Sequence, residues 1–484
     1  MNYQLLLPQI FLFLWAILIF VLDFFWKREK HTLGYVALVG IILTIFLVLT
    51  SSEGKLFGGM FLADSLSSFF NLIFLVTGFL TIASSIDFTK RLSAHQGEYF
   101  ALLLLSMVGM MLLASAGELI TLYVALELTT ISLYVLAAYL KNDRFAPLTT
   151  RLKSSEAGLK YLILGAISSG ILLYGISLIF GLTGTTFLKD IKMTLITNFL
   201  TYGEIGPALI LSLVFFIAGF GFKMALVPFH MWVPDVYEGA PTPITAFLSV
   251  ASKAAGLVAF IRVFFQSFLV FQVDWVLLMA VLAALAMIIG NIIALLQTNI
   301  KRMLAYSSIA QIGYILLGIV AATSRGLASV SFYLFVYLFA NMGAFIAAIA
   351  FSNTTGSDEI KDYAGLSRRS PALAAMMAVF MLSLVGIPPL AGFTGKYFLF
   401  SAAIEQGWIW LVVIAILTSV ISLYYYVGVV RQMYFQTSTA EKPIAMSASL
   451  KLALIISVIG VLLFGIYPNI FIDFATQAAL VFYY

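Results

Sequence analysis

Long apolar stretches, separated by short polar segments, run through the whole chain. About 20 residues of helix span the hydrocarbon core of a bilayer, and this length divides the stretches into separate elements. The division predicts fourteen transmembrane helices, at residues 5–26, 32–51, 63–86, 97–116, 118–140, 156–183, 205–232, 241–268, 275–297, 302–323, 327–351, 371–406, 408–433 and 449–475. The pattern therefore predicts an all-α polytopic membrane protein.

Composition agrees with this class and excludes others. Hydrophobic residues make up 62% of the 484 residues, charged residues make up 10%, and the mean hydropathy is +1.08. Cysteine is absent, which excludes thiolate-bound iron–sulfur clusters and disulfides, and three histidines are too few for a typical multi-histidine metal or haem site. No glycine-rich nucleotide-binding motif occurs. We therefore expect no metal or cofactor in this chain, and any electron transfer in another one.

Basic residues divide unevenly between the two sides of the predicted topology. Alternating loops place seventeen of the 26 on one side and only Lys55, Lys189, Lys192 and Arg325 on the other, with five inside the spans. Cytoplasmic loops carry an excess of lysine and arginine. We therefore expect both termini on the non-cytoplasmic side.

Four ionisable residues lie inside the apolar stretches, and three of them are lysines: Glu127, Lys223, Lys253 and Lys396. A charged side chain at mid-membrane costs about 2.5–3.5 kcal/mol on insertion scales, so it persists mainly beside a partner, a hydrated cavity or a transport pathway. Glu127 could instead be a neutral structural acid, and Lys253 could fill a polar gap between small residues. The pattern favours movement of protons or cations.

Two of these lysines lie beside helix-breaking residues. Lys223 precedes Pro228 in the seventh span, and the twelfth span carries GIPPLAGFTGK, where two prolines leave the carbonyl groups of Leu384 and Val385 without intrahelical donors. We expect both spans to be broken near mid-membrane, as in transporters with structural repeats. Helices 4–8 and 9–13 would form two inverted five-helix repeats, which divides the chain into residues 1–95, 96–270, 271–440 and 441–484.

Three more residues lie near the ends of predicted spans. Lys160 follows Glu156 by four positions, behind Ser154 and Ser155, so it either joins the pathway or forms an ordinary ion pair near a serine cap. Arg262 lies nearer a span end and is expected to be an anchor.

Polar residues also occur on the seventh and tenth spans. His230 is expected at the cytoplasmic end of the seventh span, as a proton relay or as an interfacial hydrogen-bonding group. Ser307, Gln311 and Tyr314 follow one another at spacings of four and three, which places them along one helix face. Such a stripe either holds water or forms interhelical hydrogen bonds.

Five long segments carry a resemblance to a known family: LYVALELTTISLYVLAAY, SSEAGLKYLILGAISSG, FGFKMALVPFHMWVPDVYEGAPTPITAFLSVASKAAG, IKRMLAYSSIAQIGY and GLSRRSPALAAMMAVFMLSLVGIPPLAGFTGKYF. These segments resemble the N subunit (subunit 2) of proton-pumping NADH:quinone oxidoreductase, respiratory complex I. The resemblance covers essentially the whole chain. It implies an antiporter-like membrane-arm subunit in which Glu127 is paired with Lys223, Lys253 is the central connecting lysine, Lys396 lies towards the exit side, and Lys160 is the lysine of SSEAGLKY.

The resemblance also implies what lies outside this chain. FMN, iron–sulfur clusters and quinone would be bound by partner subunits of the same translocating enzyme, among M-like, L-like and small K-, J-, A- and H-like subunits in a prokaryotic cytoplasmic membrane. Tyr333, Tyr337 and Asn341 stand where L and M subunits carry histidine and lysine, which favours the N type.

Two alternatives stay open at this point. A subunit of a multisubunit Na⁺/H⁺ antiporter or of a membrane-bound hydrogenase would share the fold. A static membrane-arm scaffold would contain the same polar groups without ion flow.

Overall fold

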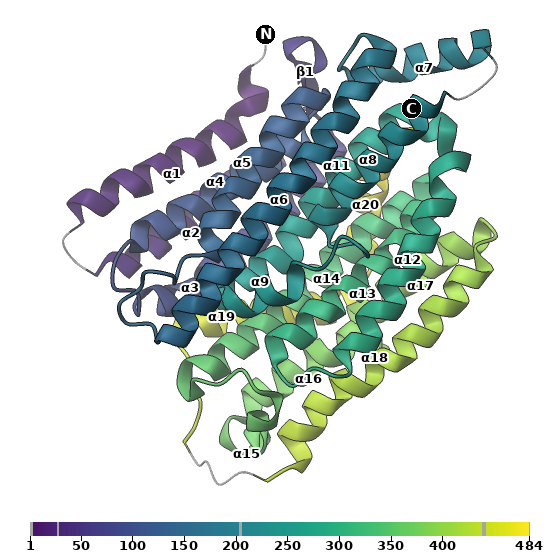
Figure 1. Ribbon diagram of the computed structural model, residues 1–484. Helices are drawn as coiled ribbons and strands as arrows, with labels where there is room; N and C mark the ends of the chain where they lie inside the picture. Colours follow the sequence, from purple (N-terminus) through teal and green to yellow (C-terminus); the bar gives the residue numbers. More distant parts are fainter. Residues whose placement is uncertain (1–2, 27–28, 203–205, 438–441, 484) are drawn as a thin grey trace.

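The computed structural model describes residues 3–26, 29–202, 206–437 and 442–483, and its long helices lie side by side in one bundle (Figure 1). Thirteen helices in this described part are long and apolar enough to cross a membrane. The interrupted pair α16 and α17 supplies one more span. The predicted all-α polytopic membrane fold with about fourteen spans is therefore confirmed.

The helices of the first half follow the predicted order closely. They are α1 (Leu7–Phe25), α2 (Leu33–Thr50), α3 (Ser65–Thr89), α4 (Gln96–Ala114), α5 (Leu119–Ala137), α6 (Leu148–Thr183), α7 (Leu188–Tyr202), α8 (Pro207–Met224), α9 (Val233–Gly239), α10 (Thr242–Phe247) and α11 (Lys253–Ser267). A π-helical segment at Leu248–Ser252 joins α10 to α11, so these two form one continuous span.

The second half continues in the same way. Its helices are α12 (Gln272–Ala294), α13 (Ile300–Val320), α14 (Ser324–Thr355), α15 (Leu366–Arg369), α16 (Pro371–Val385), α17 (Ala391–Glu405) and α18 (Ile409–Phe435), followed by α19 (Ala448–Ile466) and α20 (Asn469–Leu480). The most apolar stretch of α14 is entirely buried, and α13, α16, α17, α19 and α20 pack around it.

Side-chain caps mark where several of the spans begin. Asp64 accepts from the Ser67 backbone N–H before α3, Glu118 accepts from that of Thr121 before α5, and Asn299 accepts from that of Lys301 before α13. These bonds satisfy backbone donors that a helix start leaves without partners. Gly184 and Gly356, both with positive φ, end α6 and α14.

Both predicted helix breaks are present, one in the seventh span and one in the twelfth. Helix α8 ends at Met224, directly after Lys223, and Ala225 takes a left-handed conformation. The expected helix to residue 232 is therefore wrong, because its last eight residues form turns that lead to α9. Helix α16 ends at Val385, and Gly386 with φ +95° turns the chain towards α17.

Two elements were not expected from the hydrophobic pattern. A two-stranded antiparallel hairpin, β1 (Gly54–Leu56) and β2 (Phe61–Ala63), precedes α3, and α7 follows the sixth span. Both lie at the same end of the bundle, called here the hairpin end, whereas α15 lies at the opposite end (Figure 1).

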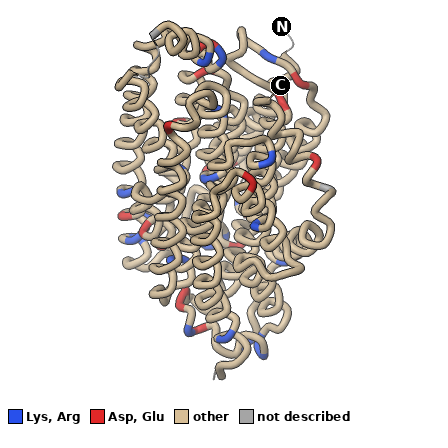
Figure 2. The backbone as a smooth tube through the Cα atoms, turned by 90° about the vertical axis from the view of Figure 1, so that its right-hand side faces the viewer, with Lys and Arg blue, Asp and Glu red and all other residues tan. Residues whose placement is uncertain are grey.

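Two boundaries also differ from expectation. Helix α6 begins at Leu148 rather than 156, so Ser154 does not cap it, and its hydroxyl instead bonds the end of α5 at the Leu140 N–H and the Ala137 carbonyl. The last predicted span, 449–475, is interrupted at Pro468, which separates α19 from α20. Figure 2 shows acidic and basic residues at both ends of the bundle and also at mid-height.

Candidate functional site

The first buried lysine lies at the end of α8. Lys223 is 4% exposed, and its Nζ has no hydrogen-bond partner among the described residues; the rings of Tyr134 and Phe222 lie 5.9 and 5.6 Å away. Gly256 of α11 packs so closely that a Cβ there would meet the Lys223 Cβ at 2.9 Å. Close packing thus holds the side chain, while its ammonium group lacks a fixed protein partner.

Glu127 lies half-buried on α5, and one carboxylate oxygen accepts a 2.5 Å hydrogen bond from Ser169 of α6. Among the described residues, no ion pair joins it to Lys223 within 4.0 Å. The structure therefore places these two residues in the same region without bringing them into contact.

Lys253 connects the two halves of the chain. It follows the π-helical segment on α11, is 1% exposed, and donates a 2.7 Å hydrogen bond from Nζ to the hydroxyl of Ser308 on α13. The ring of Tyr237 on α9 lies 6.0 Å from the ammonium nitrogen. Short π-helical segments occur frequently at functional sites.

Lys396 binds the end of the broken twelfth span. From α17, its Nζ donates to the carbonyl oxygens of Val385 at 2.8 Å and Leu384 at 3.2 Å, and to the Ser419 hydroxyl at 2.9 Å. These are the carbonyl groups that Pro388 and Pro389 were predicted to leave free. The helix break thus forms a polar cradle for one ammonium group.

The predicted stripe on α13 is buried and faces α18. Ser307 is hydrogen-bonded to the Tyr426 hydroxyl, and Gln311 donates to that same hydroxyl at 3.4 Å and to the Leu384 carbonyl at 3.1 Å. Tyr333 of α14 donates to Gln311 Oε1. Because Lys396 also contacts the Leu384 carbonyl, this network reaches the twelfth span.

Tyr314, the third member of the stripe, lies over Lys396. Its ring centre is 4.5 Å from the lysine Nζ, and its hydroxyl donates to Thr418 of α18 at 3.2 Å and accepts from Asn291 of α12 at 3.1 Å. Groups from α13, α16 and α18 therefore surround the Lys396 ammonium group.

His230 was expected at the end of the seventh span, and this placement is wrong. It lies in the turns between α8 and α9, is 7% exposed, and its Nδ1 has no hydrogen-bond partner in the described part of the chain. The break brings it inside the bundle because the helix ends eight residues early.

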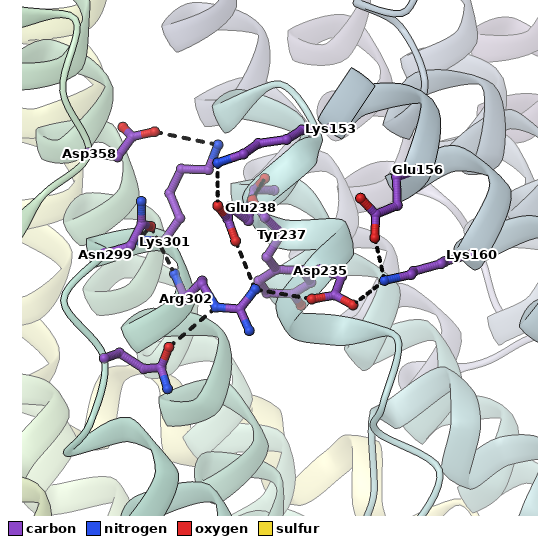
Figure 3. Close-up of polar contacts among 12 residues, drawn as sticks. Lys153, Glu156, Lys160, Asp235, Tyr237, Glu238, Asn299, Lys301, Arg302 and Asp358 are labelled. Atoms are coloured by element: carbon purple, nitrogen blue, oxygen red, sulfur yellow. Dashed lines mark hydrogen bonds and ion pairs between the residues drawn. The ribbon is translucent and has the colours of Figure 1, made fainter. Parts of the chain in front are cut away.

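Lys160 belongs to a larger group of charges than its sequence pair suggests. It contacts Glu156 at 2.5 Å and also Asp235 of α9 at 2.6 Å. Arg302 of α13 then contacts Asp235 at 3.0 Å and Glu238 at 2.7 Å (Figure 3). Lys153 completes this ionic cluster, which we define as Lys153, Glu156, Lys160, Asp235, Glu238 and Arg302, by pairing with Glu238 at 2.6 Å.

The ionic cluster joins the first half to the second through α9. Burial raises the pKa of the Asp235 carboxyl, but hydrogen bonds from Lys160 and Arg302 outweigh this effect and hold the pKa below its usual value. The pKa of Glu238 is lowered in the same way by Lys153 and Arg302. Both carboxylates are therefore ionised at neutral pH.

Sequence reasoning missed Asp235, Glu238 and Arg302 as partners of Lys160. The available signal was the spacing of the two acids, three positions apart in WVPDVYEG, which places them on neighbouring positions of one short helix. Across the described residues, no group of three or more His, Cys, Asp or Glu side chains is arranged to hold a metal ion.

A family model described as NADH:quinone oxidoreductase/Mrp antiporter, transmembrane region, matches residues 116–422. This range contains both broken spans and the residues Glu127, Lys223, Lys253 and Lys396. The chain belongs to this family of antiporter-like membrane proteins.

Curated relatives are similar over nearly their full length. NADH-quinone oxidoreductase subunit N of Moorella thermoacetica is 47% identical over 458 residues, which cover 94% of this chain and 93% of the relative. The protein of the same name from Heliobacterium modesticaldum is 45% identical over 457 residues, with the same two coverages. The resemblance to the N subunit is thereby confirmed.

Solved structures agree with this assignment. A chain of respiratory complex I from Thermus thermophilus with bound aureothin is 30% identical, with a TM-score of 0.79, over 96% of this chain and 98% of that chain. A chain of the Mrp complex from Dietzia sp. DQ12-45-1b has a TM-score of 0.85 over 100% and 98%, but is 20% identical and shows only that the fold is shared.

Proposed function

We propose that this chain carries protons across the membrane as the N-type subunit of an NADH:quinone oxidoreductase, along a pathway through Glu127, Lys223, Lys253 and Lys396. One observation carries the proposal: a buried lysine lies at the break of the seventh span and another at the break of the twelfth, and Lys253 bonds the first half to the second at Ser308. Discontinuous helices are where membrane transporters place coupling-ion sites.

In the first part of the pathway, Lys223 is suited to binding and releasing a proton. Among the described residues, the Lys223 ammonium group has no hydrogen-bond partner, and a buried polar group without one requires water or a conformational change to satisfy it. A change in the distance between Glu127 and Lys223 would then alter the proton affinity of Lys223. His230, in the adjoining turns, is an auxiliary group.

The second part of the pathway runs along α13. Hydroxyl groups both donate and accept hydrogen bonds, so Ser307 and Tyr426, which are bonded to each other, can pass a proton onwards. Ser308, which accepts from Lys253 and donates to the Ala305 carbonyl, would need water to connect it to Ser307. The Gln311 amide orients the Tyr426 hydroxyl and contacts the Leu384 carbonyl. The Leu384 carbonyl accepts from both Gln311 and Lys396 and holds no proton of its own, so water would complete the transfer from the Tyr426 hydroxyl to Lys396.

Energy for this transfer would come from outside the chain. Redox chemistry at FMN, iron–sulfur clusters and quinone in partner subunits would drive the changes, and the other membrane-arm subunits, M-like, L-like and the small ones, would transmit them. Moving one charge against 100 mV requires about 2.3 kcal/mol. One hydrogen bond to a charged group is worth about 1.5–3 kcal/mol, which is the same scale.

The orientation also follows from the proposal. The loops rich in lysine and arginine would face the prokaryotic cytoplasm, and both termini would face away from it. The ionic cluster would then lie towards the cytoplasmic side and the hairpin end towards the other.

Substitution of Lys223 by methionine in the intact complex tests the proposal. Methionine removes the charge and keeps an unbranched side chain of similar length. We expect proton translocation into proteoliposomes and coupled quinone reduction to fall together, whereas Lys451→Met, at an exposed lysine of α19, should leave both unchanged.

Mass spectrometry of the purified complex supplies the control for assembly. Flavin- and iron–sulfur-bearing subunits should accompany this chain in both variants. Normal pumping by an assembled Lys223→Met complex would support a static scaffold instead, and purification with small membrane subunits alone would favour a cation/proton antiporter.

A further inference from the structure

A pocket of about 470 Å³ opens at the hairpin end of the bundle. The β1–β2 hairpin, the start of α7, the last turns of α11 and the residues after α20 form its walls. Four basic side chains line it: Lys55, Lys189, Lys192 and Arg262. The pathway does not use any of them.

In the part of the chain that the structure describes, the three lysines of the pocket have no acidic partner. Within the described residues, no carboxylate lies within 4.0 Å of the ammonium nitrogen of Lys55, Lys189 or Lys192. This contrasts with Arg325, the fourth basic residue assigned to this side, which forms an ion pair with Glu405. The sparse positive charge of this end is therefore concentrated in one pocket rather than neutralised along the surface.

The two carboxylates of the pocket already have partners. Asp64 accepts two hydrogen bonds from the Arg262 guanidinium, at 2.5 and 2.6 Å, and Glu53 accepts one from the Ser65 hydroxyl at 2.5 Å. Arg262 neutralises Asp64, so the three lysines exceed the one remaining acid. The pocket therefore carries a net positive charge that favours an anionic ligand.

Apolar walls complete the pocket. Leu62, Phe265, Val481 and Phe482 line it together with the basic groups. Gln266, at the end of α11, has a buried side-chain oxygen without a hydrogen-bond partner among the described residues. A ligand that fits would combine an anionic group, an apolar portion and a hydroxyl donor.

We propose that this pocket binds the headgroup of an anionic phospholipid of the phosphatidylglycerol type. The pocket lies where the apolar spans α3 and α11 begin and end, which is the level of the lipid headgroups. The lysines bind the phosphate, a glycerol hydroxyl donates to Gln266 Oε1, and the acyl chains continue along the apolar walls. Inorganic phosphate would satisfy only the charges.

The test measures phospholipid retained by the purified complex in nanodiscs that contain phosphatidylglycerol and phosphatidylcholine. Native mass spectrometry compares the wild type with Lys189→Gln/Lys192→Gln, with Lys189→Arg/Lys192→Arg, and with Lys451→Gln at the opposite end. Each lysine near a lipid surface contributes about 1 kcal/mol, so the double glutamine variant should bind phosphatidylglycerol about 30-fold more weakly. The arginine and Lys451 variants should bind it as the wild type does.

Three results would overturn the proposal. The first is equal retention of phosphatidylglycerol in all variants. The second is its displacement by millimolar inorganic phosphate, because phosphate alone would then be the occupant. The third is loss of a neighbouring subunit from the double glutamine variant while lipid retention stays normal, which would identify the pocket as a subunit contact. Selective loss of one phosphatidylglycerol from the double glutamine variant would support it.

Discussion

The Lys253 ammonium group on α11 donates a 2.7 Å hydrogen bond to the Ser308 hydroxyl on α13. Lys253 belongs to the first half of the chain and Ser308 to the second, and both side chains are buried. The contact therefore joins a titratable group of one half directly to α13 of the other, at the residue next to Ser307 of the polar stripe.

Ser308→Ala should slow proton translocation without preventing assembly. The hydroxyl is a hydrogen-bond partner of a buried ammonium group, and such a bond is worth about 1.5–3 kcal/mol, so a decrease of about tenfold or more is expected. Pumping by reconstituted complex is the measurement. Ser329→Ala, at a buried serine of α14 bonded to its own helix, is the matched control and should pump normally.

Tyr426→Phe should reduce pumping as well. Phenylalanine keeps the ring but removes the hydroxyl shared by Ser307 and Gln311, and a buried group left without its partner costs about 1–3 kcal/mol. Tyr424→Phe, at a 75% exposed tyrosine of the same helix, should have no effect. Equal pumping by the two variants would remove the α18 hydroxyl from the pathway.

The ionic cluster should make stability depend on acid pH. The pKa values of Asp235 and Glu238 are lowered in the folded state, so their contribution is present at neutral pH and is lost as pH falls below the ordinary carboxyl range through the lower folded values. Thermal unfolding of the complex, recorded against pH, should show this decrease. In Arg302→Gln the decrease should begin at a higher pH, whereas an unchanged profile would contradict the role given to Arg302.

Arg262 should matter for stability more than an exposed arginine does. It is fully buried, bonds Asp64 through two nitrogens, and donates from Nε to the Ala114 carbonyl at 2.8 Å. Breaking such a buried pair costs about 3–5 kcal/mol, whereas an exposed pair is worth about 0–1 kcal/mol. Arg262→Gln should therefore lower the unfolding temperature far more than Arg325→Gln, and Asp64→Asn should partly restore it.

Much of the fold could be predicted because membrane spans are encoded locally. The length of the hydrophobic stretches predicted the spans, and the positions of the prolines predicted the breaks beside Lys223 and Lys396. The two carbonyl groups predicted to lack intrahelical donors are the ones that Lys396 binds. The anchoring role expected for Arg262 agrees with its ion pair to Asp64.

The missed features depend on partners distant in sequence or on weak local signals. Helix α7 was missed because the prediction rests on long apolar stretches, and α7 is short and carries polar residues. The hairpin strands were missed because they have only three residues each. Asp235 and Glu238 lie in a short segment whose basic partners come from α6 and α13, so pairing could not be read from spacing. The distance between Glu127 and Lys223 depends on how α5, α6 and α8 pack, which the sequence pattern does not specify.

The most direct test of the central claim is the number of protons translocated per NADH oxidised by the complex carrying Lys253→Met. The hydrogen bond to Ser308 would then be absent, and the two halves would lose their titratable connection. We predict a lower proton-to-NADH ratio together with slower quinone reduction, and wild-type values for Lys451→Met. An assembled Lys253→Met complex with an unchanged ratio would contradict a pathway through the buried lysines.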